Sequence, residues 1–337
     1  MADSAELIEA LDRRVRRRDD RREFFRHALS VGALAAGGAA SLGFAGTARA
    51  QTAAPSDSDI LNLALNLEYL EAQFYVYAVN GEGLPASQLT GTGRQGAVTG
   101  GRKANLTDRT VIQYAREIAA DELAHVAALR ATLGNAAVAQ PAINISGAAG
   151  GPFTAAATAA GIDLTASGGV FDPYANDDNF LLGAYIFEDV GVTAYQGASP
   201  LLTNVDIIDA AAGILAAEAF HAGIIRSALY ARGVATPALR TNADKISDAR
   251  DTLDGTRVSA GPPNIVADSD QGISPMTVNG QLVSNFVPTD ANGRTFSRTS
   301  EQVHNIVYLT RMQATSGGFF PNGTNNPNAA LTRSGAN

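Results

Sequence analysis

The chain contains no cysteine and no tryptophan among its 337 residues. The absence of cysteine excludes disulfides, iron–sulfur clusters, thiolate zinc sites and cysteine nucleophiles. An imidazole metal site would have to draw on the four histidines, His27, His125, His221 and His304. Charged residues make up only 17% of the chain and the net charge is −8, which argues against a general nucleic-acid binder. The apolar content of 45% is typical of a globular protein.

Residues 1–50 have the pattern of an export signal. Paired arginines at 21–22 precede a Gly/Ala-rich apolar run at about 28–46, and Ala-Arg-Ala at 48–50 matches a cleavage site. The pattern resembles a twin-arginine signal, which implies that the folded protein is periplasmic or secreted. The alternative is an uncleaved membrane anchor, although the run is rich in Gly and Ala rather than Leu. Because no second apolar run of spanning length is expected, we predict a soluble protein after cleavage.

Four later segments have apolar residues at helical spacing. They cover about residues 57–79, 107–133, 177–197 and 204–232. More than 40 residues connect the second and third segments, whereas the third and fourth are joined by a short link. These connections predict an all-α four-helix bundle with one long crossover, within a domain at 51–233.

The remaining residues are expected to support this bundle. Residues 234–337 are predicted to form a C-terminal extension packed on it, with short helices near 244–253 and 297–313 and irregular chain at 255–296. Two adjacent phenylalanines at 319–320 suggest that the turn-rich tail packs onto the core. A Gly-x-Gly-x-x-Gly sequence at 91–96 follows no predicted strand, so we interpret it as a loop.

Two Glu-x-x-His motifs carry the chemistry. Glu122 and His125 lie in the second predicted helix, whose N-cap we assign to Thr107, and Glu218 and His221 lie in the fourth. Three residues along a helix place two side chains on one face, so each pair can hold one metal ion. Two such motifs on facing helices predict a site for two ions.

An internal repeat identifies two further carboxylates. Glu68 is followed by Tyr75 after seven residues, and Glu188 is followed by Tyr195 at the same spacing, each ahead of a Glu-x-x-His helix. We therefore expect Glu68 and Glu188 to ligate or bridge the ions. The repeat selects them over the other acidic residues on these helices, Glu71 and Asp189. The two tyrosines are candidate catalytic residues, acting as hydrogen-bond donors or electron relays beside the ligands. Packing in the core is the alternative for both.

Glu71, Asp121 and His304 are the other polar residues of interest on the predicted helices. Glu71 is expected to face a polar neighbour or solvent, with a role as an alternate ligand left open. Asp121 lies one turn before His125 and could orient its ring. His304, on the last predicted helix, is expected to be structural or exposed.

The full pattern resembles the ferritin-like dimetal-carboxylate bundles. Within them it is similar to the exported ferritin-like group that includes plant desiccation-related proteins, on the residues at 66–72, 187–195 and 318–323. The similarity extends over most of 57–323. The ligands that it implies are Glu68, Glu122, His125, Glu188, Glu218 and His221.

The cofactor is expected to be two metal ions. Oxygen-rich ligands with one imidazole per ion suit iron or manganese, and zinc would bind without redox chemistry. Rubrerythrins carry an additional four-cysteine iron, which this chain cannot hold. Bacterioferritins hold haem on a methionine where this chain has Leu123, so haem is not expected.

The resemblance leaves two classes of function. One is an exported oxidoreductase that acts on O2, H2O2 or ferrous iron in oxidative stress defence, as a ferroxidase, peroxidase or manganese-catalase-like enzyme. The other is a non-catalytic stress or structural protein whose metal site stabilises the bundle. In both cases we expect a homo-oligomer with no nucleic-acid partner.

Overall fold

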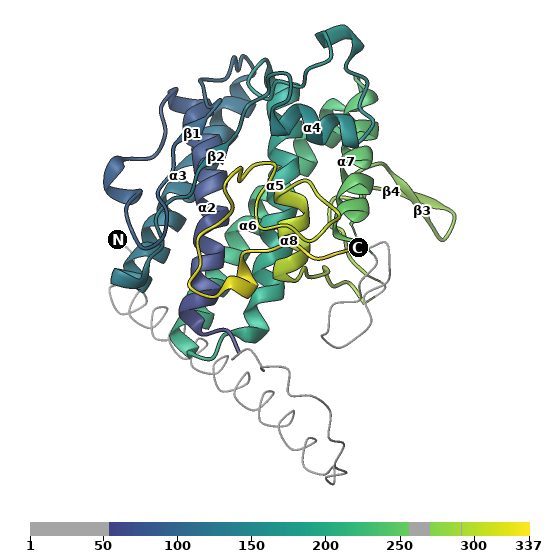
Figure 1. Ribbon diagram of the computed structural model, residues 1–337. Helices are drawn as coiled ribbons and strands as arrows, with labels where there is room; N and C mark the ends of the chain where they lie inside the picture. Colours follow the sequence, from purple (N-terminus) through teal and green to yellow (C-terminus); the bar gives the residue numbers. More distant parts are fainter. Residues whose placement is uncertain (1–53, 256–269, 291) are drawn as a thin grey trace, which may run out of the picture. The chain divides into compact units, whose positions relative to one another are not determined.

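Four long helices form the predicted bundle in the computed structural model, which describes residues 54–255, 270–290 and 292–337. They are α2 (Asp57–Asn80), α3 (Arg109–Leu133), α5 (Asp177–Ala198) and α6 (Val205–Arg232). Helix α2 packs mainly against α3, and α5 packs mainly against α6, as Figure 1 shows. The all-α bundle is confirmed, and the predicted export signal lies outside the described residues.

Local capping signals explain where these helices begin and end. Ser56 accepts a hydrogen bond from the Asp59 backbone N–H and forms a capping box at the start of α2, and Gly81 ends the helix at φ 85°. The N-cap of α3 is Asp108, so the assignment to Thr107 was wrong. The Thr107 hydroxyl instead donates to Asp177, which ties the start of α3 to the start of α5.

The long crossover runs over residues 134–176 and contains its own short elements. They are η3 (Gly134–Ala136), β2 (Ile143–Asn144), α4 (Pro152–Ala159) and η4 (Thr165–Ser167). Strand β2 pairs in parallel with β1 (Val98–Thr99), in the loop that joins α2 to α3 and also holds η2 (Ala86–Gln88). The glycine-rich residues 91–96 lie in this loop, so the prediction of a loop is confirmed.

The C-terminal extension contains more regular structure than its sequence suggests. Helix α7 (Ala238–Asp254) begins directly after Pro237, earlier than predicted, and α8 (Ser300–Val307) is shorter than predicted. Leu309 has φ 54°, which prevents α8 from continuing to residue 313. Strands β3 (Met276–Val278) and β4 (Gln281–Val283) form an antiparallel hairpin in a region expected to be irregular. Two further short helices are η5 (Ser199–Leu201), which follows α5, and η6 (Ala329–Leu331), near the C-terminus.

The hydrophobic core lies along α2 and α5. Every residue of α2 from Ile60 to Val76 is buried, because the C-terminal tail covers the surface that the other bundle helices leave open. Phe319 packs edge-on against Phe153 and Phe187, at ring-centroid distances of 5.1 and 4.9 Å. The tail phenylalanines are both fully buried, as their sequence suggested.

Helix α6 combines an apolar sequence with buried polar residues. By length and composition it could cross a membrane, contrary to the expectation that no second run would qualify. Glu218, His221 and Arg226 on this helix are nevertheless buried in contact with other helices of the bundle. Such contacts indicate a bundle helix, since charged groups are costly to bury without partners.

Buried ion pairs fasten the extension to the bundle. Asp189 on α5 accepts hydrogen bonds from Arg226 of α6 and Arg250 of α7, both at 2.8 Å. The guanidinium groups of Arg250 and Arg298 also share Asp270, at 2.6 Å. Asp189 is thus committed to this network rather than to the predicted metal site.

Candidate metal centre

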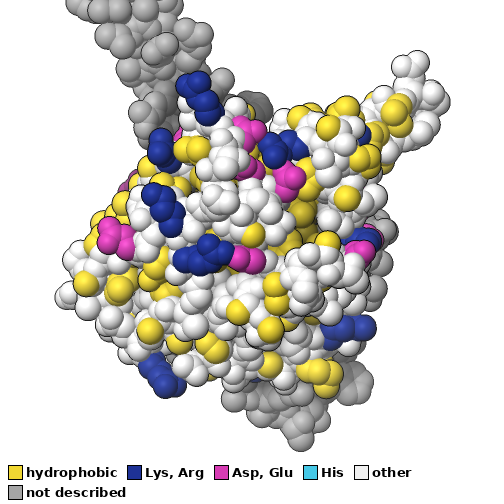
Figure 2. Space-filling model, turned by 90° about the horizontal axis from the view of Figure 1, so that it is seen from above, with side chains coloured by type: hydrophobic (Ala, Val, Ile, Leu, Met, Phe, Trp, Pro, Cys, Tyr) yellow, Lys and Arg dark blue, Asp and Glu magenta, His cyan; other side chains and the backbone are white. Residues whose placement is uncertain are grey.

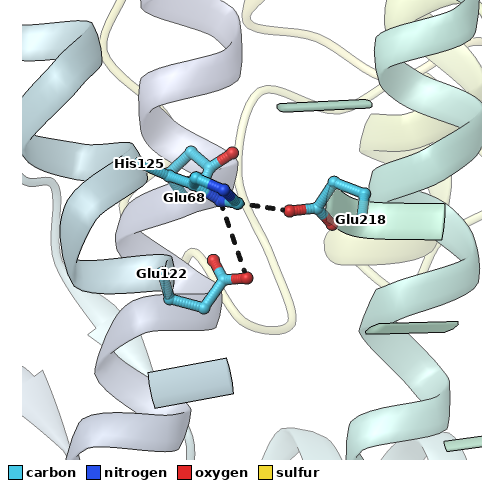
Figure 3. Close-up of side chains that lie close together, drawn as sticks. All are labelled: Glu68, Glu122, His125 and Glu218. Carbon is cyan, nitrogen blue, oxygen red and sulfur yellow. Dashed lines mark ion pairs between the residues drawn. The ribbon is translucent and has the colours of Figure 1, made fainter. Parts of the chain in front are cut away.

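Three helices bring the first group of predicted ligands together. Glu68 comes from α2, Glu122 and His125 from α3, and Glu218 from α6. His125 Nδ1 lies 3.2 Å from Glu68 Oε2, 3.3 Å from Glu218 Oε1 and 3.8 Å from Glu122 Oε1. Figure 3 shows these side chains pointing toward one another between the helices. One cation could therefore be held by one imidazole and three carboxylates.

A second group of predicted ligands lies beside the first. His221 Nδ1 lies 3.2 Å from Glu122 Oε1 and 3.7 Å from Glu188 Oε2. Glu122 belongs to both groups, which places it between the two candidate ion positions. Glu68 belongs to the first group alone, whereas Glu188 belongs to the second group and also to a third, with Glu71 and Glu218.

Glu71 joins the cluster, although its sequence position suggested a polar neighbour or solvent. Its side chain is buried, and its carboxylate lies close to the carboxylates of Glu188 and Glu218. Gly191 lies opposite and leaves room, because a Cβ there would lie 2.4 Å from Glu218 Oε2 and 3.3 Å from Glu71 Oε1. The signal in the sequence was the three-residue spacing from Glu68, which puts Glu71 on the same helix face.

The two tyrosines of the repeat bond across the bundle. The Tyr195 hydroxyl donates to Glu68 Oε1 at 2.5 Å, and the Tyr75 hydroxyl donates to Glu188 Oε1. Each tyrosine thus donates its hydrogen bond to the glutamate of the other repeat, not to the glutamate seven residues before it. The exchange is possible because α2 and α5 are antiparallel, so a residue two turns after one glutamate lies level with the other.

Asp121 and His304 both contact residues on other segments of the chain. Asp121 does not orient His125; its Oδ2 lies 3.2 Å from His221 Nε2, across the contact between α3 and α6. This contact leaves His221 Nδ1 free to face the carboxylates. His304 is structural, because it is fully buried and contacts the Ser300 backbone oxygen and the Thr324 hydroxyl at 2.7 and 3.0 Å.

Burial and mutual repulsion shift the pKa values of the clustered carboxyl groups. Burial, and then repulsion among the neighbouring carboxylates, raises the pKa values of Glu71, Glu122 and Glu188 well above the ordinary range. Burial raises the pKa of Glu218 to about 7. Burial opposes protonation of His125, but the adjacent Glu218 and Glu68 outweigh it and raise its pKa to about 10.

The donor atoms fit a metal pair. Nine buried side-chain atoms of the cluster have no hydrogen-bond partner among the described residues. They are Glu68 Oε2, Glu71 Oε2, both carboxylate oxygens of Glu122 and Glu218, Glu188 Oε2, His125 Nδ1 and His221 Nδ1. Buried polar atoms are rarely left without a partner in native proteins. This concentration of potential metal-ligand atoms therefore points to bound cations. The centre is enclosed, since only 8% of His125 and 2% of His221 are exposed. Figure 2 shows no histidine surface among the described residues on the face that it draws.

The sequence is similar to known proteins over most of its length. The family model of the ferritin-like domain matches residues 56–231. Desiccation-related protein PCC13-62 of Craterostigma plantagineum is 31% identical over 79% of this chain and 82% of its own length. Ferritin-like catalase Nec2 of Nesocodon mauritianus is 29% identical over 80% of this chain and 84% of its own length. With more than half of its residues matched and its carboxylates and histidines converging inside the four-helix bundle, the chain belongs to the ferritin-like family.

Proposed function

We propose that the protein holds two redox-active metal ions, iron or manganese, and converts hydrogen peroxide. The observation that carries the proposal is the buried cluster of five carboxylates and two imidazoles with nine unpartnered donor atoms. The similarity to a ferritin-like catalase supports peroxide as the substrate. The reaction is 2 H2O2 → 2 H2O + O2, in which one peroxide is reduced and the other is oxidised.

The ligands divide into two sets. Glu68 and His125 would hold one ion, Glu188 and His221 would hold the other, and Glu122 with Glu218 would lie between them. Carboxylate oxygens with one imidazole per ion suit iron and manganese. When bound, such a pair supplies two electrons to one peroxide and takes two from the next.

The other residues of the site position these ligands. Tyr195 donates a hydrogen bond to one oxygen of Glu68, and Tyr75 donates one to one oxygen of Glu188. The second oxygen of each glutamate is left to face the cluster. Asp121 holds the ring of His221 from its outer side. Hydrogen bonds of this kind orient metal ligands and tune their basicity, so we assign these three residues a positioning role.

The cellular setting is also part of the proposal. The N-terminal pattern supports export by the twin-arginine route, so the protein would meet peroxide outside the cytoplasm. Loading metal before export would favour the redox-active ions over zinc. A role in oxidative stress defence follows from peroxide removal.

The test combines metal analysis with peroxide turnover. Protein exported by its native host is expected to contain about two iron or manganese ions per chain, measured by elemental mass spectrometry, and to release O2 from H2O2 in an oxygen electrode. Glu122→Gln should lose both properties, whereas Glu117→Gln, on the exposed side of the same helix, should keep both. Two zinc ions, or bound metal without O2 release in any metal form, would contradict the proposal.

That negative result would favour a second function. The similarity to a desiccation-related protein supports a non-catalytic role, in which the ions stabilise the bundle. Metal removal would then lower the melting temperature while peroxide turnover stays at background in every sample.

A further inference from the structure

An apolar cavity lies beside the candidate metal centre. It has a volume of about 260 Å³ and lies between α2, the C-terminal end of α5, η5 and α8. Ile60, Leu63 and Leu67 of α2 form one wall, Tyr195 forms part of another, and Val303 of α8 closes a third side. Leu201 also lines the cavity and is half exposed, so it marks the opening toward solvent. A concave space lined mainly by apolar side chains is typical of small-molecule sites.

The charges around the cavity restrict the ligand. Arg298 is the only charged residue among the described residues that line it. Its guanidinium is fully buried and pairs with Asp254 and Asp270, both at 2.6 Å. An anionic ligand would therefore find no unpaired cation, and burying its charge there would be costly. Thr299 and Ser300 also line the cavity at the start of α8 and can supply polar contacts. The Thr299 hydroxyl accepts a hydrogen bond from the Gln302 backbone N–H, so it can still donate its own proton.

The volume restricts the size of the ligand. A cavity of ~150 Å³ lined by aliphatic side chains holds benzene, which has six non-hydrogen atoms. In proportion, the cavity of about 260 Å³ would hold a molecule of roughly ten non-hydrogen atoms. We infer that this cavity is a binding site for a neutral, mainly apolar small molecule of that size, with one polar group directed at the hydroxyls of Thr299 and Ser300.

The position of the site links it to the metal centre. Tyr195 lines the cavity, and its hydroxyl donates to Glu68. A bound molecule therefore contacts the side chain that positions a predicted metal ligand. Binding itself requires only the cavity, so the inference stands independently of peroxide turnover.

The test compares a neutral and an anionic probe of nearly equal size on the full chain. 1-Octanol should bind with one molecule per chain in isothermal titration calorimetry, and octanoate should bind at least tenfold more weakly. No detectable binding of 1-octanol, or octanoate binding as tight as that of 1-octanol, would overturn the inference.

Three variants locate the binding. Ala198→Leu adds a branched side chain to the cavity lining and should weaken 1-octanol binding at least tenfold. Ala212→Leu, at an exposed position of α6, is the matched control and should bind like the unchanged protein. Leu201→Gln makes the opening polar without burying new volume and should weaken binding several-fold even if Ala198→Leu folds poorly. Unchanged binding in Leu201→Gln and in a folded Ala198→Leu protein would refute this location.

Discussion

Metal removal should reverse the direction in which stability changes with pH. Burial raises the pKa of Glu218 from its ordinary value of 4.5 to about 7 in the metal-free fold. The folded protein therefore keeps a proton that the unfolded chain releases at lower pH. The stability contributed by this carboxyl is fully present below pH 4.5 and is lost as the pH rises toward 7. At ~1.4 kcal/mol per pH unit, the interval between the two values corresponds to about 3 kcal/mol of unfolding free energy.

Other groups of the cluster act in the same direction. The pKa values of Glu71, Glu122 and Glu188 are also raised by burial, and their stabilising contribution is lost with rising pH as well. The raised pKa of His125 extends the loss from pH 6.5 toward about 10. In the metal-loaded protein the sign is opposite, because protons compete with the ions for the carboxylates and affinity increases with pH.

Urea unfolding followed by circular dichroism measures this effect. Protein stripped of metal with a chelator is compared with the Glu218→Gln variant, treated in the same way, at pH 5 and at pH 7.5. Glutamine does not titrate, and the pH dependence of all distant groups cancels in the difference between the two proteins. The unchanged protein should lose about 2 kcal/mol relative to the variant between these two pH values, because pH 5 already lies above the unfolded-state pKa of 4.5. If both chelated proteins keep the same difference at the two pH values, or if the unchanged protein gains stability, the reasoning is wrong.

Three further predictions concern other sites. The pKa of buried His304 is lowered by burial to about 4, so unfolding free energy should fall by about 3 kcal/mol as pH decreases from 6.5 to 4, and His304→Gln should remove that part of the acid sensitivity. Glu71→Gln should weaken binding of one of the two ions roughly tenfold by titration calorimetry, with Glu117→Gln unchanged; equal affinities would exclude Glu71 as a ligand. Gly191→Ala should lower the number of metal ions bound per chain, because the new Cβ would meet the carboxylates of Glu218 and Glu71. In Gly213→Ala the new Cβ would meet nothing within 4 Å, so this variant should raise the melting temperature slightly.

The bundle helices could be predicted because their signals are local. Apolar periodicity, the Ser56 capping box and the glycine at position 81 depend on residues within one or two turns of the chain. The same is true of each Glu-x-x-His pair, since the helix alone puts both side chains on one face. The boundaries of α7 and α8 were less predictable, because the extension is held by contacts with the bundle, such as the hydrogen bond from the Arg298 backbone N–H to Thr193 O.

Partners across the bundle were decided only by the tertiary structure. The sequence placed Tyr75 on the face of Glu68, but the antiparallel arrangement of α2 and α5 directs it to Glu188. Asp121 contacts His221 rather than the histidine four residues away, because α6 passes beside it. The contacts of a side chain on a helix face depend on which helix lies opposite and on which residues of that helix lie at the same height along the bundle. Helical spacing therefore determined which residues share a face, and packing determined what each of them meets.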